Sequence, residues 1–142
     1  MASNTGFYSF DKVIATFGGV PLTGFAEGDD AITIRRRAPT HDVKVGAGGD
    51  TVVNQMADRT GEIIIKLLQT SPSNAVLAAI LTAAEKGSPK IALPFMVVDR
   101  LNGGELAMAP LCVVSGHADK PFGANQNGRE WTLIATHLEM AS

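Results

Sequence analysis

Short runs of alternating hydrophobic and polar residues, separated by turn residues, make up most of this 142-residue chain. A period of two is typical of a strand that buries one face. The alternation predicts strands at residues 12–17, 20–25, 31–37, 41–45, 51–57, 62–69, 91–99, 105–116 and 130–140. Residues 62–69 and 130–140 are apolar on both faces, so we expect each of these strands to contact neighbours on both sides. In the last strand, Trp131, Leu133 and Ala135 fall on one face and Ile134, Leu138 and Met140 on the other.

A single helix interrupts this pattern. Ser71 is a suitable N-cap, and Pro72 suits the first helical position because a missing N–H costs nothing there. Lys86 falls in the predicted last turn, and Gly87 suits the position that follows the helix. One face carries apolar residues at helical spacing: Val76, Leu77, Ile80, Leu81 and Ala84. These signals predict a helix over residues 72–86.

The turn residues indicate how the strands are connected. Asn-Gly pairs at residues 102–103 and 127–128 are strong hairpin signals, and Pro94 within a predicted strand indicates an edge or a bulge. Strands joined by short turns, without an alternation of strand and helix, favour antiparallel sheets. We therefore expect a mainly β fold, an antiparallel β-sandwich or open barrel with one flanking α-helix, in a single domain over residues 1–142.

The glycine-rich run GAGGD at residues 46–50 has two interpretations. A phosphate-binding loop would need the pattern G-x-G-x-x-G, but Thr51 occupies the third glycine position, and a strand rather than a helix follows. A hairpin turn between the strands at 41–45 and 51–57 fits the run better. We expect this hairpin to belong to an extended segment near residues 26–60.

Composition favours a protein that associates with other copies. Hydrophobic residues make up 45% of the chain and charged residues only 18%, so more apolar surface is left than a monomer needs. The net charge of −2 argues against a protein that binds nucleic acid by neutralising phosphates. The N-terminal residues lack a signal-peptide pattern, and no apolar run approaches the roughly 18 residues of a membrane span. We expect a soluble protein that is made in the cytosol and does not bind membranes.

Reactive side chains do not form a known catalytic or metal-binding pattern. Cys112 lies in an apolar run and is interpreted as a buried hydrophobic residue, while His41, His117 and His137 lack the spacing of metal ligands. We therefore predict no catalytic residue, no metal, no cofactor and no enzymatic activity. An enzyme or ligand-binding protein that uses His41, His117, Cys112 or Asp99 remains a weaker hypothesis.

The densest charged cluster is Arg35, Arg36 and Arg37, and Asp29 and Asp30 precede it in an acidic loop. Strand alternation places Arg35 and Arg37 on one face and Arg36 on the other. A solvated strand end is the simplest interpretation of the arginines, and a salt bridge between subunits is the alternative.

Several motifs in a fixed order resemble the tail tube proteins of contractile-tailed bacteriophages. The resemblance is best between Ile32 and Leu81, and its most distinctive part is L-x-T-S-P-x-N-x-x-L, from Leu68 to Leu77. The motifs in order are Y-S-F, I-T-I, V-x-V-G-x-G-G-D, N-Q-M, R-T-G-E-I-I-I and L-L-Q-T-S-P-S-N-A-V-L, which occupy residues 8–10, 32–34, 43–50, 54–56, 59–65 and 67–77.

The resemblance implies a structural virion protein that forms hexameric rings, which stack into the inner tube of a tail and give a conduit for DNA ejection. It implies as partners other copies of the chain, a tail sheath protein, a tape-measure protein, and baseplate and tail-terminator proteins, with non-specific passage of DNA. Assembly would take place in the host cytoplasm, and the product would lie in the virion tail. The tube of a type VI secretion system or a phage-derived bacteriocin is the alternative.

The same resemblance implies that the extended segment near residues 26–60 contacts neighbouring subunits. We expect the charged residues of that segment to make these contacts: Asp29, Asp30, Arg35, Arg36, Arg37, Lys44 and Asp50.

Overall fold

The computed structural model describes residues 5–87, 92–101 and 106–141. These residues form one α-helix, a short 3-10 helix at Phe10–Lys12 and ten strands. The strands are β1 (Val13–Phe17), β2 (Val20–Pro21), β3 (Ile32–Arg36), β4 (His41–Val45), β5 (Thr51–Gln55), β6 (Gly61–Leu67), β7 (Leu93–Asp99), β8 (Leu106–Val114), β9 (Arg129–Ala135) and β10 (Glu139–Ala141). The helix, α1, spans Ser73–Lys86.

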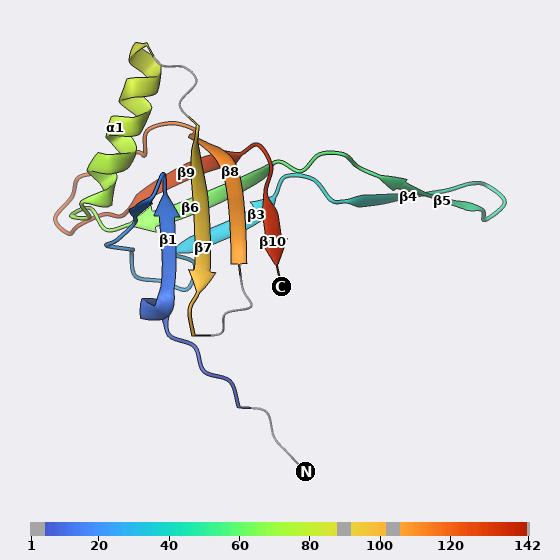
Figure 1. Ribbon diagram of the computed structural model, residues 1–142, viewed down its shortest axis with the longest axis horizontal. Helices are drawn as coiled ribbons and strands as arrows, with labels where there is room; N and C mark the ends of the chain where they lie inside the picture. Colours follow the sequence, from blue (N-terminus) through green and yellow to red (C-terminus); the bar gives the residue numbers. More distant parts are fainter. Residues whose placement is uncertain (1–4, 88–91, 102–105, 142) are drawn as a thin grey trace.

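Eight strands form one antiparallel sheet in the order β2-β1-β7-β8-β9-β6-β3, with β10 paired to β8 outside that order. The long strand β8 joins two halves of the sheet: it pairs with β7 from Leu106 to Cys112, with β10 along its first part and with β9 along its last part. Strands β3, β6 and β9 cross the direction of β1, β7 and β8, so the sheet closes over itself (Figure 1). The predicted antiparallel sandwich or open barrel with one flanking helix is confirmed.

The core lies between the two halves of the sheet. Alternate residues of β6 and β9 face inward and are opposite one another: Ile63 pairs with Leu133, and Ile65 with Trp131. From the other half, Phe17 and Phe95 reach the same cluster with at most 1% of their surface exposed. The second face of β6 is only half-buried within this chain. Full burial on both sides, which the sequence predicts for this strand, therefore requires contacts from outside the chain.

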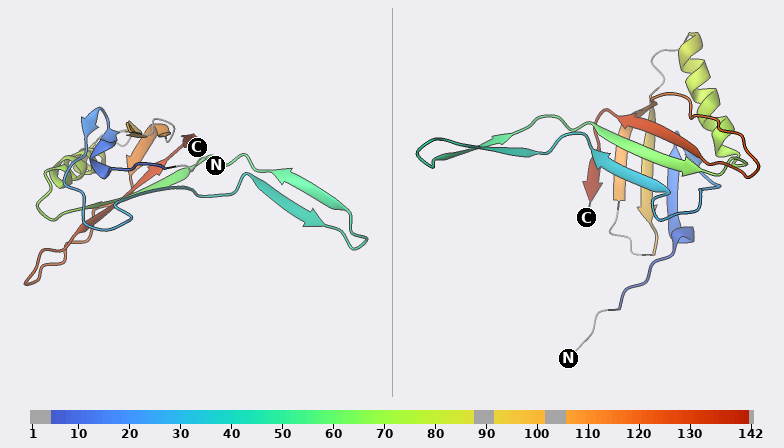
Figure 2. Two further views of the ribbon diagram at one scale, coloured as in Figure 1. Left: turned by 90° about the horizontal axis from the view of Figure 1, so that it is seen from below. Right: turned by 180° about the vertical axis from the view of Figure 1, so that it is seen from behind.

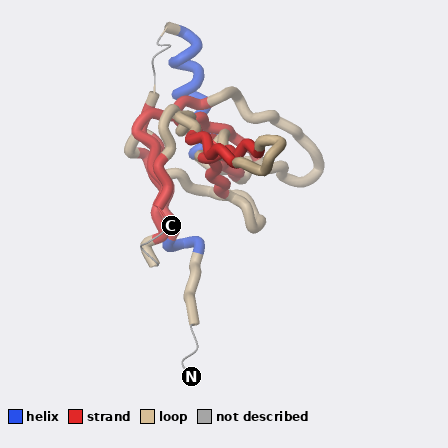
Figure 3. Tube along the Cα trace, turned by 90° about the vertical axis from the view of Figure 1, so that its right-hand side faces the viewer, coloured by secondary structure: helices blue, strands red, loops and turns tan. Residues whose placement is uncertain are grey.

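Helix α1 lies at one end of the molecule and the N-terminal segment at the other (Figures 1 and 3). It begins at Ser73, one residue later than the prediction, although Pro72 already has helical dihedral angles of −66° and −20°. The N-cap position falls on Pro72, one residue after the predicted Ser71, and Pro72 makes no side-chain capping bond. Ser71 Oγ still accepts a hydrogen bond from the Ser73 N–H at 3.2 Å at the start of the helix. Leu77 and Leu81 bury the inner face of the helix, and Gly87 ends it.

The prediction of one continuous strand over residues 130–140 is wrong, because the chain turns within this segment. Strand β9 ends at Ala135, and β10 then pairs with β8 rather than extending β9. The turn brings Leu138 into the core, where it is fully buried, and its N–H donates to the Arg59 carbonyl oxygen at 2.8 Å. Leu138 therefore does not share a face with the half-buried Ile134. No glycine or proline marks this turn, which explains why the alternation did not reveal it.

Two smaller predictions also change. The strand predicted at 20–25 is reduced to Val20–Pro21, and Phe25 instead forms an isolated bridge with Leu67. Pro94 lies in an interior strand, where a register shift between Leu93 and Phe95 gives the bulge that was one of two predicted alternatives. The hairpin turn predicted at residues 102–103 and the strand starts at 91 and 105 lie outside the described residues.

Candidate assembly surfaces

Strands β4 and β5 form a hairpin that projects away from the body of the molecule (Figures 1 and 2). They make a separate two-stranded sheet in which Val43 is opposite Val53. The GAGGD run forms the tip, where the Gly46 N–H donates to the Asp50 carbonyl oxygen at 2.7 Å. The hairpin-turn interpretation of this run is therefore confirmed.

One face of the hairpin is apolar and uncovered. Because Val43 and Val53 are cross-strand partners and Val45 is two residues along β4, the three side chains lie on the same face, which we call the valine face. Val43 is 54% exposed, Val53 is 62% exposed and Val45 is 67% exposed. On the opposite face, Lys44 and Asp42 form an ion pair at 3.3 Å. Apolar side chains held this far from a core are typical of a protein-binding surface.

The base of the hairpin is fixed to the body by hydrogen bonds. The Met56 N–H donates to the Thr40 carbonyl oxygen at 2.7 Å, which continues the hairpin ladder below β4 and β5. The Arg36 guanidinium donates to the carbonyl oxygen of Leu138 at 3.1 Å and to the Thr40 hydroxyl at 3.3 Å. Arg36 thus links the hairpin base to the turn before β10.

Asp58 organises the returning arm of the hairpin. Its carboxylate accepts hydrogen bonds from the Thr60 hydroxyl at 2.6 Å and from the Thr60 N–H at 2.9 Å. The hydroxyl bond is the main reason that the pKa of Asp58 is below its usual value. The turn from Asp58 to Thr60 therefore favours the ionised form of Asp58.

Three of the predicted contact residues form ion pairs within the chain. Arg35 and Glu62 are cross-strand neighbours, and their side chains form an ion pair at 2.8 Å. Asp30 pairs with Lys66 at 2.7 Å, and that hydrogen bond lowers the pKa of Asp30 and raises the pKa of Lys66. Lys44 is the third, in its pair with Asp42.

The other predicted contact residues are more open or differently used. Asp29, Arg37 and Asp50 are exposed. Arg36 is half-buried at the hairpin base, on the opposite side of β3 from Arg35 and Arg37, as the alternation predicts. The contact role of all seven residues remains a prediction.

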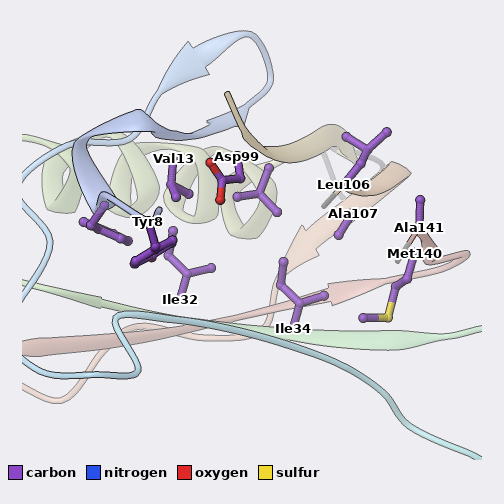
Figure 4. Close-up of a pocket in the computed structure, with 11 residues that line it drawn as sticks. Tyr8, Val13, Ile32, Ile34, Asp99, Leu106, Ala107, Met140 and Ala141 are labelled. Atoms are coloured by element: carbon purple, nitrogen blue, oxygen red, sulfur yellow. The ribbon is translucent and has the colours of Figure 1, made fainter. Parts of the chain in front are cut away.

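An apolar groove of about 240 Å³ lies between β3 and the strands that cross it (Figure 4). In Figure 4, Ile32 and Ile34 of β3 point towards β1 and β8, with Tyr8 at one end of the groove and Met140 at the other. The lining residues come from five strands and the N-terminal segment: Tyr8, Phe10, Val13, Ile32, Ile34, Val97, Asp99, Leu106, Ala107, Met140 and Ala141. Asp99 is 3% exposed and accepts a hydrogen bond from the Leu101 N–H, so it presents little charge to the groove.

The loop before β9 presents a single exposed aromatic side chain. Phe122 is 77% exposed, and the guanidinium of Arg129 lies 5.3 Å from the centre of its ring. Arg129 is itself only 6% exposed and donates to the Asn127 carbonyl oxygen at 2.9 Å. The loop therefore holds Phe122 at the surface in a defined position.

Sequence reasoning missed the groove and Phe122. The groove exists only because β3 crosses the other half of the sheet, and no single segment of sequence contains that information. Phe122 could have been noticed, since an aromatic residue within the polar stretch HADKPFGANQNG is unusual for a solvated loop.

The residues of the enzyme hypothesis are not assembled into one site. Cys112 is fully buried, and burial raises the pKa of its thiol to about 12. His41 lies on the projecting hairpin, and His117 lies in the loop after β8. Asp99 is the only one of these four residues that lines the groove. Within the described residues, no three His, Cys, Asp or Glu side chains gather in a way that could hold a metal ion.

The described part of the chain contains no helix with the length and apolar character needed to cross a membrane.

Comparisons with known proteins place the chain in a family and show which solved structures share its fold. No curated protein sequence matches the chain. Among solved structures, it is similar to the sheath/tube terminator of an extracellular contractile injection system, with a TM-score of 0.70, 10% identity, and coverage of 99% of this chain and 100% of that one. It is also similar to the tube-terminating cap of the anti-feeding prophage, with a TM-score of 0.70, 11% identity, and coverage of 100% and 95%.

A third similar structure is the sheath–tube complex of the same type of extracellular injection system, with a TM-score of 0.65, 11% identity, and coverage of 92% of this chain and 88% of that one. At these identities the structures establish the shared fold. The family evidence comes from sequence: the model of the family described as bacteriophage PhiTE tail tube protein matches residues 5–141. The chain therefore belongs to the PhiTE tail tube protein family of bacteriophages.

Proposed function

We propose that copies of this chain form hexameric rings that stack into the inner tube of a contractile tail, through which DNA passes during ejection. Family membership already gives the chain a structural role in a phage or phage-derived tail, and that role points away from an enzyme. The observation that carries the assembly proposal is the projecting hairpin with its uncovered valine face. Among the described residues, β4 and β5 pair with each other and with no strand of the main sheet, so the hairpin is suited to contact another copy.

Free strand edges support closure of the ring. Strand β3 lies at one end of the strand order and pairs, within the described residues, with β6 alone. An unpaired edge exposes backbone N–H and C=O groups that a neighbouring strand can satisfy. Pairing of β3 with a strand of the next subunit would extend the sheet around the ring and close it without a free edge.

The second face of β6 fits the same arrangement. Ile64 is half-buried in the isolated chain, beside charged Glu62 and Lys66. Contacts from neighbouring subunits or from the tube contents would complete its burial.

The charged residues of the segment near 26–60 are proposed to set the register between subunits. They are Asp29, Asp30, Arg35, Arg36, Arg37, Lys44 and Asp50. Surface charges of this kind contribute more to orientation and partner choice than to affinity. In this proposal residues 1–142 act as one domain, and the hairpin is its contact arm.

The proposed partners follow from the role in a tail. Self-association and a surrounding sheath are favoured, because the similar solved structures are sheath–tube and terminator assemblies. A tape-measure protein inside the tube, and baseplate and terminator proteins at its ends, complete the proposed set. Assembly would take place in the host cytoplasm, without a membrane partner.

Two other functions remain for comparison. The tube of a type VI secretion system or of a phage-derived bacteriocin would use the same surfaces with a different cargo. A tube terminator is the second candidate, and it is favoured by one observation: both structures with a TM-score of 0.70 are terminators or caps. A terminator would form a single ring that ends a tube, whereas a tube subunit would form stacks.

Native mass spectrometry of the purified protein over a range of concentrations tests the ring. We expect a species with six copies and multiples of it as rings stack. A discrete hexamer without larger species would favour the terminator. A protein that stays monomeric at every concentration would contradict both forms of the proposal.

A further inference from the structure

We propose that the valine face of one copy docks into the groove between β3, β8 and β10 of a second copy. This inference rests on the proposed self-assembly and adds the receiving surface, which family membership does not specify. The contact between stacked rings would then be made by two defined surfaces, the valine face of one copy and the groove of another.

The hairpin is directed away from its own body, where another copy can contact it. Both views in Figure 2 show β4 and β5 directed away from the body, and the hydrogen bonds of Arg36 to Thr40 and Leu138 tie the base of the hairpin to the body. Val43 and Val53 are held side by side by the strand register rather than by a flexible loop. The valine face is therefore a preformed, projecting apolar surface, and docking it costs little ordering entropy.

The groove is the concave counterpart. Its floor contains the half-buried Ile32 and Ile34, and its outer end is formed by Met140, which is 51% exposed. Leu106 of β8 lies on the side opposite β3. Apolar side chains from crossing strands surround an open volume of about 240 Å³. Such a groove gains stability when apolar atoms displace its water.

The distribution of charged residues is compatible with docking of the valine face into the groove. The valine face carries no charged residue between His41 and Gln55 on its side of the hairpin, since Asp42 and Lys44 lie on the other side. The groove contains one ionisable carboxyl, Asp99, which is 3% exposed and hydrogen-bonded to its own chain. Neither surface would bury an unpaired charge on docking, which is the usual penalty for an incorrect contact.

The geometry gives an open assembly. The valine face and the groove are different surfaces, so each copy can give its hairpin to one copy and receive a hairpin from another. A heterologous contact of this kind continues as a stack rather than stopping at a dimer. This is the arrangement that a tube requires.

Paired lysine substitutions test both surfaces. Val43→Lys introduces a charge on the valine face, and Val52→Lys is its matched control, because Val52 is 59% exposed on the opposite face of the same hairpin. Met140→Lys introduces a charge in the groove, with Met96→Lys as the control, since Met96 is 40% exposed and does not line the groove. Circular dichroism and unfolding midpoints establish that each variant is folded.

The critical concentration for pelleting of stacks is the readout. We expect Val43→Lys and Met140→Lys each to raise it by at least about tenfold, and both controls to leave it within about twofold. A mixture of the two defective variants should form paired rings without elongation, because one supplies an intact groove and the other an intact hairpin. Normal stacking by Met140→Lys would overturn the groove as the receiving surface.

Cross-linking identifies the occupant directly. The substitutions Val45→Cys and Met140→Cys are made in separate chains. The two proteins are mixed and treated with a short bismaleimide, each end of which forms a thioether with one cysteine thiol. We expect a mixed dimer from this pair and none from Val52→Cys with Met96→Cys. Assemblies that cross-link Met140→Cys to Phe7→Cys of another chain instead would overturn the inference in favour of the N-terminal segment. Wild-type protein that never assembles would overturn the proposed function itself.

Discussion

Trp131 on β9 donates a hydrogen bond from Nε1 to Oδ1 of Asn74 in the first turn of α1, at 2.9 Å. The amide group of the same Asn74 donates to the Leu68 carbonyl oxygen at 2.8 Å, just after β6. One side chain thus joins the helix, the core tryptophan and the end of β6. Asn74 also belongs to the T-S-P-x-N motif that distinguishes the sequence.

Replacing Asn74 with alanine is expected to destabilise the fold by about 1–3 kcal/mol, because the Trp131 N–H and the Leu68 carbonyl oxygen both lose their partner. Urea unfolding, followed by tryptophan fluorescence, measures the change. Asn54→Ala, on the exposed hairpin strand β5, is the control and should have almost no effect. Equal stability of the two variants would show that the Asn74 contacts do not support the helix.

Gly24 is expected to tolerate no side chain. Its φ is +71°, and a Cβ atom there would lie 2.6 Å from Ser71 Oγ and 3.1 Å from Ser71 Cα. Ser71 cannot move away easily, since its hydroxyl donates to the Thr23 carbonyl oxygen and accepts from the Ser73 N–H. Gly24→Ala should cost about 2–4 kcal/mol of unfolding free energy.

Gly48→Ala is the matched control for Gly24, because nothing lies within 4 Å of a Cβ atom at Gly48. Thermal unfolding of both variants gives the comparison. A Gly24→Ala protein as stable as Gly48→Ala would mean that Gly24 does not lie in tight contact with Ser71.

The Arg35→Ala variant distinguishes an effect on folding stability from an effect on assembly. Its ion pair with Glu62 is solvent-exposed, with 60% of the Arg35 side chain accessible, so Arg35→Ala should reduce stability by less than about 1 kcal/mol. If Arg35 also contacts a neighbouring subunit, the same variant should assemble only at clearly higher protein concentration, and more so in high salt. Unchanged assembly of a folded Arg35→Ala protein would remove Arg35 from the proposed contact set.

Cys112 is expected to be unreactive in the folded protein. Burial removes all of its exposed surface and raises the pKa of the thiol to about 12, so little thiolate forms at pH 8. A disulfide reagent such as 5,5′-dithiobis(2-nitrobenzoate) should label it only when the chain unfolds. Rapid labelling in native buffer would contradict the described packing of β8.

The returning arm of the hairpin should loosen in acid. The pKa of Asp58 is lowered from 3.8 in the folded chain, mainly by the Thr60 hydroxyl. The stabilisation is present above the unfolded pKa and is lost as the pH falls through the folded pKa. Hydrogen exchange of the Thr60 N–H should therefore accelerate below about pH 4, beyond the intrinsic trend.

Asp58→Asn is the control for that effect, because it cannot titrate. It should show faster exchange at Thr60 at neutral pH and no further change in acid. Identical pH profiles for the two proteins would mean that Asp58 does not hold the arm.

The sequence predicted the elements whose signals are local. Helix α1 was found because Ser71, Pro72 and Gly87 mark its ends, and the hairpin because GAGGD separates two alternating runs. The break between β9 and β10 was missed, because Leu138 continues the alternation although the chain turns there to bury it. Alternation records which residues are apolar, but not the direction of the chain.

The surfaces required three-dimensional information. That the valines of β4 and β5 face solvent rather than the core depends on the hairpin leaving the body, and Val43 reads in sequence as an ordinary buried strand residue. The charged residues Asp30 and Arg35 were recognised as a cluster, but their intrachain partners Lys66 and Glu62 come from a distant segment. That Ile34 lines the same groove as residues of β8 and β10 depends on the crossing of the sheet.

Cryo-electron microscopy of the purified protein, concentrated until it assembles, tests the central claim most directly. We expect stacked six-membered rings around a hollow lumen, with the β4–β5 hairpin of each subunit placed on a subunit of the adjacent ring. A protein that remains monomeric at high concentration, or that assembles with its hairpins exposed to solvent, would contradict it.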